Sequence, residues 1–487
     1  MLILGDVLFG TQVGTERRMP FLPPSFEQVA FSEAVIDSRL ATPGCLFVAL
    51  RGERVDGHDF LADAMAHGAR GALVQREQIE RLRLADPVTV LDTSNDAGWG
   101  SNHEAFLLIA VDEPLAAVQR LASFHRSRLT TTVIGVTGSV GKTSTKEATA
   151  AVLQQAFRTL KTPRSYNSEA TLPIVLLQIA DHHDVAVLEM GMYQPGDIAL
   201  LADIARPQIG IVTNVGPSHL ERVGSLDGIQ QAKSELPRAL PADGVAILNY
   251  DDRRVRAMAE LTAARPFFYG CDASADLWGE LIENRGFGGI SIRAHYQGAA
   301  VELELPLIGV HSLYTALAGA AAGLVMGMEW DAIRAGLQHA GTAARLRTLS
   351  GPHGTTLIDD TYNAAPASMQ AALQILAATP GRRIAVLGDM RELGTIEEAA
   401  HRQVGEWAAG IADILVTLGR CGRWIAIGAR EAGMPAEQII AVDERAEVVA
   451  LLEELIVPGD TILLKGSRAM EMEQIVAALA APVQQIS

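Results

Sequence analysis

The sequence predicts an α/β protein of three domains. We expect a small α/β N-terminal domain over residues 1–128, a central domain with a doubly wound, mostly parallel sheet over 129–341, and a C-terminal Rossmann-like domain over 342–487. A chain of 487 residues is too long for one hydrophobic core. Short apolar runs alternate with helical segments in two separate series. A Gly-rich turn joins a strand to a helix at the start of the first series.

The N-terminal region contains short β-rich runs beside one helical stretch. The runs "CLFVAL" and "GALV" have the length and composition of strands, and "HDFLADAMAHGA" has helical spacing. Residues 75–105 are polar and irregular, so we expect an irregular surface segment there. This mixture predicts a small α/β domain.

The two later regions each read as a series of strand–helix units. In the central region "TTVIGV", "DVAVLEM", "QIGIVTN" and "GVAILN" are continuous and apolar, as strands buried on both faces are. Alternating runs between about 265 and 306, such as "GISIRAHY", indicate a small antiparallel addition. The C-terminal region repeats the pattern with "TTLIDD", "RIAVLGD", "DILVTLG" and "DTILLKG". Helices between these runs predict parallel sheets in both regions.

Composition and charge exclude several classes of protein. Hydrophobic residues make up 48% and charged residues 20%, which is typical of a globular protein. A formal net charge of −17 disfavours nucleic acid or an anionic membrane as partner, because both would be repelled. The three cysteines (Cys45, Cys271 and Cys421) show no paired spacing and predict neither disulfides nor a zinc site. The start "MLILGDVLFGTQVG" is a poor signal peptide and no segment is long enough to span a bilayer, so we expect a cytoplasmic protein.

The stretch "VIGVTGSVGKTSTKEA" predicts a phosphate-binding loop, or P-loop, in the central domain. Gly138 and Gly141 let backbone amides turn inward around phosphate oxygens. Lys142 would reach the β- and γ-phosphates, and the Thr143 hydroxyl would ligate Mg²⁺ at the helix N-terminus. Val136 stands where the general pattern has its first glycine. The expected ATP-binding residues of the loop are Gly138, Ser139, Val140, Gly141, Lys142, Thr143 and Ser144.

Together with this loop, the order of the later motifs resembles the Mur ligase superfamily, whose loop has the form T-G-x-x-G-K-[ST]. The motifs that follow are "LEMGM", "TNVGPSHLE", "IQQAKSEL", "GVHSLYTALA", "RLR" and "IDDTYNAAPASM". Residues 37–69 resemble the uridine-nucleotide-binding domain of members that act on the longer peptides. The stretches "DDTYNAAPASMQAAL", "LGDMRELG" and "KGSRAMEME" resemble the branch that adds D-alanyl-D-alanine. The resemblance covers nearly the whole chain.

This resemblance implies an ATP-dependent amide ligase of peptidoglycan precursor synthesis, with a role in cell wall biogenesis, cell shape and cell division. Such a ligase would add D-alanyl-D-alanine to UDP-N-acetylmuramoyl-tripeptide through an acyl phosphate, giving ADP and phosphate. Because a carboxylate must approach a triphosphate, metal ions and cationic side chains have to offset the repulsion. A hinged monomer that binds only small-molecule substrates is expected.

The resemblance also implies two Mg²⁺ ions and their ligands. Thr143 and Glu189 would hold one ion between the β- and γ-phosphates, and Glu189 ends the apolar strand "DVAVLEM". His219 would ligate the second ion. Lys233 would be carbamylated by CO₂, which converts a cation into a carboxylate-like ligand. Arg345 would contact the γ-phosphate and completes the expected catalytic set with Lys142.

Further residues are assigned by resemblance to the nucleotide and to the two substrates. Asp360 and Asn363 would hold the nucleotide after the C-terminal domain swings in. The expected contacts of the muramoyl-peptide substrate are Asp37, Ser38, Arg39 and Asn167. The expected contacts of the incoming dipeptide are Lys465, Ser467, Arg468 and Asp389, where a cationic pair after a strand suits a free carboxylate.

The chain departs from the family pattern at several positions. Ser165 and Ser168 replace two asparagines around Asn167. After His311 the chain has Ser312 and Thr315 in place of asparagines that contact adenine or ribose in the family. Ala365 replaces another asparagine, and "ARLR" replaces the usual Gly-Arg before Arg345. None of these changes falls on an expected metal ligand.

Two alternatives remain on the sequence alone. A muramoyl ligase that adds diaminopimelate or lysine would be expected to carry an Asp-Asn-Pro-Arg type motif, and "GDMRELG" occupies the comparable region instead. A non-catalytic nucleotide-binding partner would use the P-loop only as a switch. Retention of Lys142, Thr143, Glu189, His219 and Lys233 together argues against that role, because a switch needs no second-metal ligands.

Overall fold

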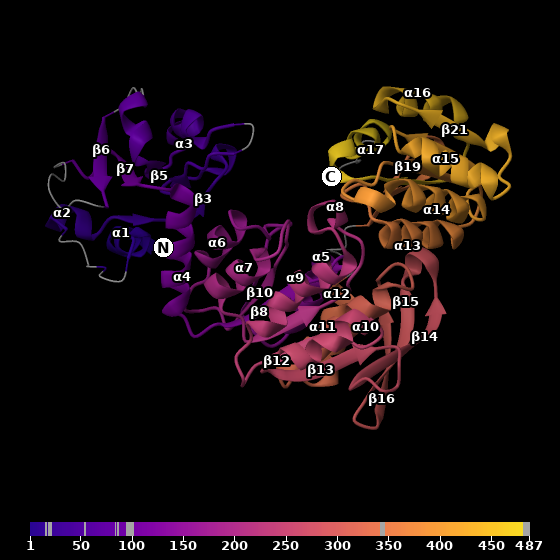
Figure 1. The fold of residues 1–487 in the computed structure, drawn as a ribbon, viewed down its shortest axis with the longest axis horizontal. Coiled ribbons are helices and arrows are strands. Elements are labelled where there is room, and N and C mark those ends of the chain that lie inside the picture. The colour runs from indigo at the N-terminus through magenta and orange to yellow at the C-terminus, as the bar shows by residue number, and fades with distance from the viewer. Residues whose placement is uncertain are drawn as a thin grey trace, which may run out of the picture. The chain divides into compact units, whose positions relative to one another are not determined.

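The computed structural model describes residues 1–14, 17, 22–52, 55–82, 84, 87–93, 102–340 and 346–480. These residues form two compact units. The first contains residues 1–135, 158–191 and 197–208, and the second contains 136–157, 192–196 and the residues described from 209 onward. The predicted α/β class is confirmed, because parallel strands and helices build both units (Figure 1).

The N-terminal part of the first unit is a five-stranded sheet in the order β3-β4-β5-β7-β6, in which all neighbours are parallel. Its strands are β3 (Ala34–Val35), β4 (Leu46–Val48), β5 (Gly71–Gln75), β6 (Val88–Asp92) and β7 (Phe106–Val111). The apolar sequences of β4 and β7 are buried along their full length, as expected for strands covered on both faces. Helix α3 (Leu61–Ala66) contributes Leu61 and Ala64 to the same core.

Strand β6 corrects the expectation that residues 75–105 are irregular. It pairs in parallel with β7 at the edge of the sheet. Only alternate side chains of β6 are buried, Thr89 and Leu91, whereas Val88 and Val90 are exposed. An edge strand with a single large apolar residue on its buried face lacks the continuous apolar run of a buried strand, so the sequence pattern missed it.

Helices complete the first unit (Figure 1). The short strand β1 (Leu2–Ile3) pairs antiparallel with β2 (Ala30–Phe31). Helix α1 (Leu4–Thr11) packs on α4 (Pro114–Ser127), and α4 packs on α6 (Thr171–Leu176) and α7 (Asp197–Ala205). The buried Arg126 of α4 donates to the Ala205 carbonyl at 2.8 Å and to the Leu129 carbonyl at 2.9 Å. These bonds satisfy its guanidinium and fix α4 to the end of α7.

The largest sheet has nine strands in the order β16-β15-β14-β13-β12-β11-β8-β10-β9, and its strand β8 (Thr132–Thr137) belongs to both units. In the first unit β9 (Thr159–Lys161) and β10 (Val185–Glu189) are parallel. The strands of the second unit are β11 (Ile209–Val212), β12 (Val245–Asn249), β13 (Arg265–Gly270), β14 (Leu277–Asn284), β15 (Ile290–Tyr296) and β16 (Ala299–Leu305). Strands β11 to β13 are parallel, and β14 to β16 form the antiparallel addition that the sequence predicts.

Two helices of the second unit pack closely against the P-loop helix. Helix α5 (Lys142–Leu153) contacts α11 (Ser312–Val325) and α12 (Trp330–Ala340). Small residues allow this approach: a Cβ added to Gly336 would lie 2.4 Å from the Val152 Cα, and one added to Gly319 would lie 3.3 Å from Ala148. The Ala-rich segment "LYTALAGAAAGLV" is therefore a buried packing helix, and none of the helices in the described ranges combines the length and apolar character needed to cross a bilayer.

The C-terminal part of the second unit is a six-stranded sheet in the order β17-β18-β22-β19-β20-β21. Its strands are β17 (Arg347–Ser350), β18 (Thr356–Asp359), β19 (Arg383–Gly388), β20 (Ile414–Leu418), β21 (Ile439–Val442) and β22 (Thr461–Lys465). All pairs are parallel except β17 with β18. Two separate hydrophobic clusters hold helices on this sheet: α13 (Pro366–Ala377), α14 (Glu397–Ala409) and α15 (Gly422–Glu431) in one, α16 (Arg445–Leu455) and α17 (Glu473–Leu479) in the other. This arrangement confirms the Rossmann-like prediction.

Candidate nucleotide-binding and ligase site

The P-loop is held in shape by the strand next to β8 in the sheet. The Ser139 and Val140 amides donate to the Asn214 carbonyl and side-chain oxygens, each at 2.9 Å. The Thr213 hydroxyl and the Asn214 amide both donate to the Val140 carbonyl, at 2.7 and 2.9 Å. Gly138 has φ +145°, and a Cβ there would lie 1.9 Å from the Thr213 Oγ1. Glycine is therefore required where the loop passes Thr213.

The loop leads directly into α5. Gly141 is the N-cap residue and adopts a left-handed conformation with φ +86°, which favours glycine. The N-terminal amides of α5 carry no intrahelical partner and favour an anion. Lys142 Nζ donates to the Gly138 carbonyl at 2.8 Å and to the Ser139 carbonyl at 3.3 Å, so its charge lies over the loop. Thr143 is buried in the first turn.

Lys233 is buried in the same unit as the P-loop. It lies in α9 (Leu226–Arg238) and is 1% exposed. Burial, and to a smaller extent the charge of Lys142, holds the pKa of the Lys233 amine well below its usual value. The lowered pKa favours the neutral amine, which is the form that can react with CO₂.

His219 contacts a carboxylate that the sequence did not flag. It caps α8 (Leu220–Val223) and adopts φ 60°. Its Nδ1 lies 2.5 Å from the Glu392 Oε2, and its ring lies 5.7 Å from that of Tyr193. The hydrogen bond from His219 lowers the pKa of the Glu392 carboxyl, so Glu392 is ionised and accepts the proton that Nδ1 carries. The Nε2 atom of a neutral imidazole is then left with its lone pair.

Glu189 and Asn167 lie together in the first unit. Glu189 ends β10 and is fully buried. Its Oε1 accepts a hydrogen bond from Asn167 Nδ2 at 2.7 Å, and its backbone amide donates to the Thr162 hydroxyl at 3.0 Å. A Cβ added to Gly191 would lie 2.9 Å from the Asn167 side chain, which keeps this approach close. The sequence assigned the two residues to different ligands and did not predict their contact.

Asp37, Ser38 and Arg39 form a tight turn in the first unit. The Asp37 carboxylate caps a 3₁₀ turn (Ser38–Leu40) and accepts from the Arg39 backbone and guanidinium at 2.7–3.1 Å. The hydrogen bond from the Arg39 side chain lowers the pKa of the Asp37 carboxyl. Ser38 is buried, whereas the Arg39 side chain is 82% exposed. Of the three, Arg39 presents its charge most openly.

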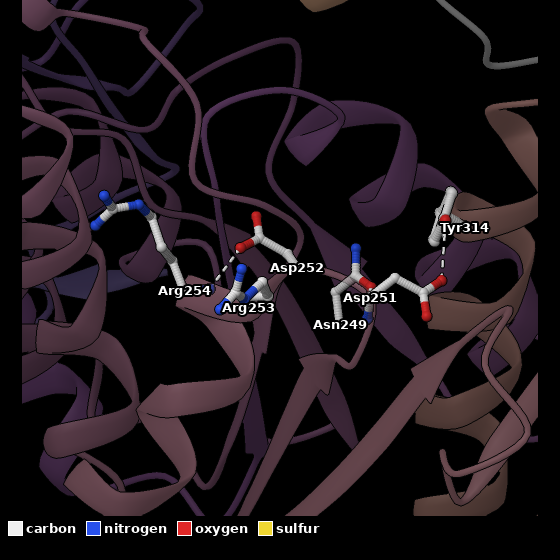
Figure 2. A pocket seen from close by; sticks show the side chains of 6 residues that line it. All are labelled: Asn249, Asp251, Asp252, Arg253, Arg254 and Tyr314. Atoms are coloured by element: carbon white, nitrogen blue, oxygen red, sulfur yellow. Dashed lines mark hydrogen bonds between the residues drawn. The ribbon is translucent and has the colours of Figure 1, made fainter.

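A cavity of about 500 Å³ opens beside the carboxyl end of β12 (Figure 2). Its lining residues are Asn249, Asp251, Asp252, Arg253, Arg254 and Tyr314. The Tyr314 hydroxyl donates to Asp251 Oδ2 at 2.9 Å, and the Cys271 amide donates to the same oxygen at 2.6 Å. Burial raises the pKa of the Tyr314 phenol, so it remains a donor. The lining combines an aromatic ring, an amide, two carboxylates and two arginines at the carboxyl end of a parallel strand, which is where α/β sheets bind ligands. The sequence alone did not indicate this set, although "LNYDD" contains the end of a predicted strand.

Lys465, Asp360 and Asn363 meet at the carboxyl ends of β22 and β18. Lys465 is 1% exposed, and its Nζ donates to Asp360 Oδ2 at 2.6 Å and to the Asn363 carbonyl at 2.9 Å. The sequence assigned Lys465 to the dipeptide and the other two residues to the nucleotide. Their contact makes Lys465 an internal partner of Asp360. Arg345, the expected γ-phosphate contact, lies outside the described residues.

Asp389 and Ser467 tie β19 to its neighbours. Asp389 is fully buried, and its Oδ1 accepts from the Cys421 and Gly422 amides, both at 2.9 Å, at the start of α15. The Ser467 amide donates to the Asp389 carbonyl at 3.0 Å. Arg468, by contrast, has a 65% exposed side chain, which is paired with Glu473 at 3.0 Å. Arg468 is thus an exposed cation of this region, as are Arg391 and Arg420.

One buried trio in the described ranges has the spacing of a metal site: Asp389, His401 and Cys421. Both ring nitrogens of His401 are already used, because Nε2 accepts from the Met390 amide at 2.9 Å and Nδ1 donates to the Glu397 carbonyl at 2.6 Å. Burial raises the pKa of the Cys421 thiol to about 11, so it stays protonated. The trio therefore offers a metal ion neither an unused ring nitrogen nor a thiolate.

The chain matches three Mur ligase domains. The Mur ligase family catalytic domain matches residues 32–126, the Mur ligase middle domain matches 136–323, and the Mur ligase glutamate ligase domain matches 344–468. The UDP-N-acetylmuramoyl-tripeptide--D-alanyl-D-alanine ligases of Synechocystis sp. and Escherichia coli (strain K12) are each 36% identical to it, over 93% of this chain and 93% and 94% of theirs. The chain belongs to the Mur ligase family.

Solved structures of Mur ligases have the same fold. Crystal structure I of MurF from Acinetobacter baumannii superposes with a TM-score of 0.78 at 28% identity and covers 97% of both chains. MurF ligase from Thermotoga maritima in complex with ADP gives a TM-score of 0.73 at 26% identity, over 92% of this chain and 96% of that one. These neighbours confirm the three-part Mur ligase fold, with a nucleotide bound in one of them.

The donor groups of this Mur ligase fit divalent cations. Thr143, His219 and Lys233 belong to the second unit, and Glu189 belongs to the first. Glu189 is a fully buried carboxyl group, and a cation nearby would offset the cost of burying its charge. Oxygen ligands from Glu189 and Thr143 suit Mg²⁺. A hydroxyl, a carboxyl group and an imidazole are each, taken singly, of the types that ligate divalent cations.

The departures from the family pattern now have a structural setting. The Ser312 hydroxyl donates to the Ile308 carbonyl at 2.8 Å at the start of α11, and both Ser312 and Thr315 are buried. Tyr314, between them, is the residue of this turn that lines the cavity beside β12. The side chains at 312 and 315 are thus packed, and the polar contact to the cavity comes from Tyr314.

Proposed function

We propose that this protein is an ATP-dependent ligase that joins D-alanyl-D-alanine to UDP-N-acetylmuramoyl-tripeptide. The observation that carries the proposal is a similarity of 33–36% identity, over more than nine-tenths of the chain, to ligases named for this reaction. The reaction yields the pentapeptide precursor of peptidoglycan, ADP and phosphate, and so serves cell wall synthesis. We expect a monomer in the cytoplasm.

The reaction proceeds in two steps. A carboxylate oxygen of the tripeptide attacks the γ-phosphorus of ATP, and the bond to the β-phosphate oxygen breaks to release ADP. The amine of D-alanyl-D-alanine then attacks the acyl carbon, loses a proton, and expels phosphate with the former carboxylate oxygen. The P-loop amides and Lys142 offset the negative charge that would otherwise oppose the first step. Closure of the C-terminal domain excludes water, which would hydrolyse the acyl phosphate.

Thr143, Glu189, His219 and a modified Lys233 would hold two Mg²⁺ ions. Bound there, the ions supply charge neutralisation between the carboxylate and the triphosphate. The Lys233 amine attacks CO₂ through its lone pair and loses a proton, which gives a carbamate anion. Its burial and its lowered pKa support this modification. A carbamate carbon signal in ¹³C NMR after exchange with ¹³C-bicarbonate, lost in Lys233→Met, is the expected result.

The cavity beside β12 is proposed to take the nucleoside of ATP. It lies in the same unit as the P-loop and joins the ends of β12 and α11. Tyr314 offers a ring face for the base, and the Asp251 and Asp252 carboxylates accept hydrogen bonds from ribose hydroxyls. In this chain these groups take the role of the asparagines that Ser312 and Thr315 replace.

We assign the substrate contacts mainly to side chains that are exposed. Arg39 is proposed to face the diphosphate of the muramoyl substrate, with Asp37 fixing its guanidinium. Arg468 is proposed to bind the free carboxylate of the dipeptide, since its side chain is open whereas Lys465 is committed to Asp360. Asn167 is proposed to act on the muramoyl peptide while it supports Glu189.

The test is an amine screen at fixed ATP and UDP-muramoyl-tripeptide. Phosphate is measured with D-alanyl-D-alanine, single D-alanine, lysine, diaminopimelate or no amine. Of these amines, we expect only the dipeptide to support phosphate release. Loss of that release in Lys142→Ala would separate the activity from a contaminating ATPase. Equal phosphate release with diaminopimelate, or release that ignores the amine, would reject the assignment.

A further inference from the structure

Glu392 and His219 join two segments of the second unit that are far apart in sequence. Glu392 follows β19 of the C-terminal sheet, and His219 follows β11 of the nine-stranded sheet. The Glu392 Oε2 lies 2.5 Å from His219 Nδ1, although 173 positions separate the two residues. The contact therefore forms only when the C-terminal sheet and α8 are docked on each other.

The backbone around the contact is held in an unusual conformation on both sides. His219 has φ 60° and Glu392 has φ 65°, in a left-handed region that non-glycine residues seldom occupy. The Glu221 amide donates to the Glu392 carbonyl at 3.2 Å. A Cβ added to Gly394 would lie 3.0 Å from the Glu221 Cα, so the two segments touch backbone to backbone. Such conformations persist where the surroundings hold them, and they are concentrated at functional sites.

The second oxygen of the same carboxylate is also engaged. Glu392 Oε1 lies 3.7 Å from Arg222 Nε, and the Arg222 guanidinium lies over the Tyr193 ring at 5.2 Å. The Tyr193 ring lies 5.7 Å from the His219 ring. One carboxylate oxygen thus faces the imidazole and the other faces a guanidinium, which restricts the rotation of Glu392 and with it the plane of the imidazole.

An ionised carboxylate can only accept hydrogen bonds, so His219 must donate through Nδ1. The tautomer that carries its proton on Nδ1 presents its lone pair at Nε2. A carboxylate that orients a histidine in this way fixes its tautomer and strengthens its binding of a metal. We propose that Glu392 is a positioning residue by which the docked C-terminal domain sets His219 in its metal-binding tautomer. This inference rests on the proposed function, in which His219 ligates Mg²⁺.

The first readout is the tautomer of His219, which needs neither metal nor substrate. Protein labelled with ¹⁵N-histidine is studied by two-bond ¹H–¹⁵N NMR at constant, mildly alkaline pH, and His219→Gln assigns the signal. We expect the Nδ1–H form in the parent protein and a shift toward the Nε2–H form in Glu392→Ala. Glu392→Gln, whose amide oxygen still accepts a hydrogen bond, is expected to be intermediate. Arg222→Ala, which keeps the carboxylate, is expected to retain the parent tautomer.

The second readout is metal affinity. Mn²⁺ is titrated into the protein with a non-hydrolysable ATP analogue and followed by electron paramagnetic resonance. We expect Glu392→Ala to bind Mn²⁺ about 10- to 100-fold more weakly, the range for loss of such a supporting carboxylate. The Mg²⁺ concentration for half-maximal turnover is expected to rise similarly while the KM for the dipeptide stays constant. Glu437→Gln, an exposed carboxylate of the same domain, is expected to match the parent.

If folded Glu392→Ala keeps the His219 tautomer and the Mn²⁺ affinity of the parent protein, the inference is overturned, and the Glu392–His219 contact serves only packing. Circular dichroism and thermal scans establish that the variant is folded, and Glu392→Gln gives the same test if alanine is not tolerated. Failure of the proposed function is a different result. The parent protein would then show no dipeptide-dependent phosphate release, whereas the NMR comparison would still be readable.

Discussion

Replacing Gly138 by alanine is expected to damage nucleotide binding far more than overall stability. The new Cβ would lie 1.9 Å from the Thr213 Oγ1, 3.0 Å from the Thr213 Cβ and 3.2 Å from the Asn214 amide. The last two groups belong to the chain segment that pins the loop, so the clash cannot be relieved by turning a flexible side chain. Either the loop or the end of β11 has to move.

The size of the effect follows from two contributions. Overpacking of this kind costs roughly 1–3 kcal/mol. Displacing Thr213 also removes its hydrogen bond to the Val140 carbonyl, which is worth about 1 kcal/mol. If the nucleotide-binding conformation bears the whole sum of about 2–4 kcal/mol, ADP binds roughly 30- to 700-fold more weakly.

The assay is isothermal titration of ADP in the presence of Mg²⁺. Gly433→Ala is the matched control, because Gly433 has φ +92° and a Cβ there meets nothing within 4 Å. It carries the backbone penalty without a clash and is expected to leave the ADP Kd unchanged. The double variant Gly138→Ala/Thr213→Ala removes the closest atom and is expected to recover at least about tenfold of the loss. An ADP Kd within about threefold of the parent in Gly138→Ala would refute the reasoning.

Three further outcomes are expected. Tyr314→Phe removes the donor that fixes Asp251 in the cavity beside β12, so ADP affinity is expected to fall about tenfold by calorimetry, which corresponds to about 1.4 kcal/mol; an unchanged Kd would place the nucleoside elsewhere. Lys465→Met leaves the Asp360 carboxylate without its cation and is expected to cost about 3 kcal/mol, seen as faster hydrogen exchange in β18 and β22, while Lys465→Met/Asp360→Asn recovers most of it. Exposed Cys271 is expected to react first with a thiol reagent at pH 8, whereas buried Cys421 reacts only on unfolding. Because burial raises the pKa of the Cys421 thiol to about 11, this thiol stabilises the fold fully below the unfolded-state pKa of about 8.5, and that stabilisation is lost as the pH rises toward 11.

The strands and the P-loop follow from local sequence. Strands such as β10 and β19 are buried on both faces, and their apolar runs are visible without any partner. The loop is equally local, since Gly138 and Gly141 supply the backbone freedom and Lys142 the charge. These features need no knowledge of how distant segments meet.

The residue pairs of the site do not follow from local sequence. Glu392 and His219 are 173 positions apart, and Lys465 and Asp360 are 105 apart. The family resemblance assigns a role to single residues, but only the folded structure shows which of these residues contact one another. Lys465 and Asp360 show the consequence, because residues predicted to contact the dipeptide and the nucleotide, respectively, are hydrogen-bonded to each other. Edge strand β6 was missed for a related reason, since its pairing with β7 rather than its own pattern defines it.

The most direct test of the proposed chemistry follows one oxygen atom. UDP-muramoyl-tripeptide is prepared with ¹⁸O in its terminal carboxylate and incubated with the protein, ATP and D-alanyl-D-alanine, and the products are analysed by mass spectrometry. An acyl phosphate requires one labelled oxygen in each released phosphate and the other in the new amide. Phosphate that carries no label while ADP accumulates would contradict the account.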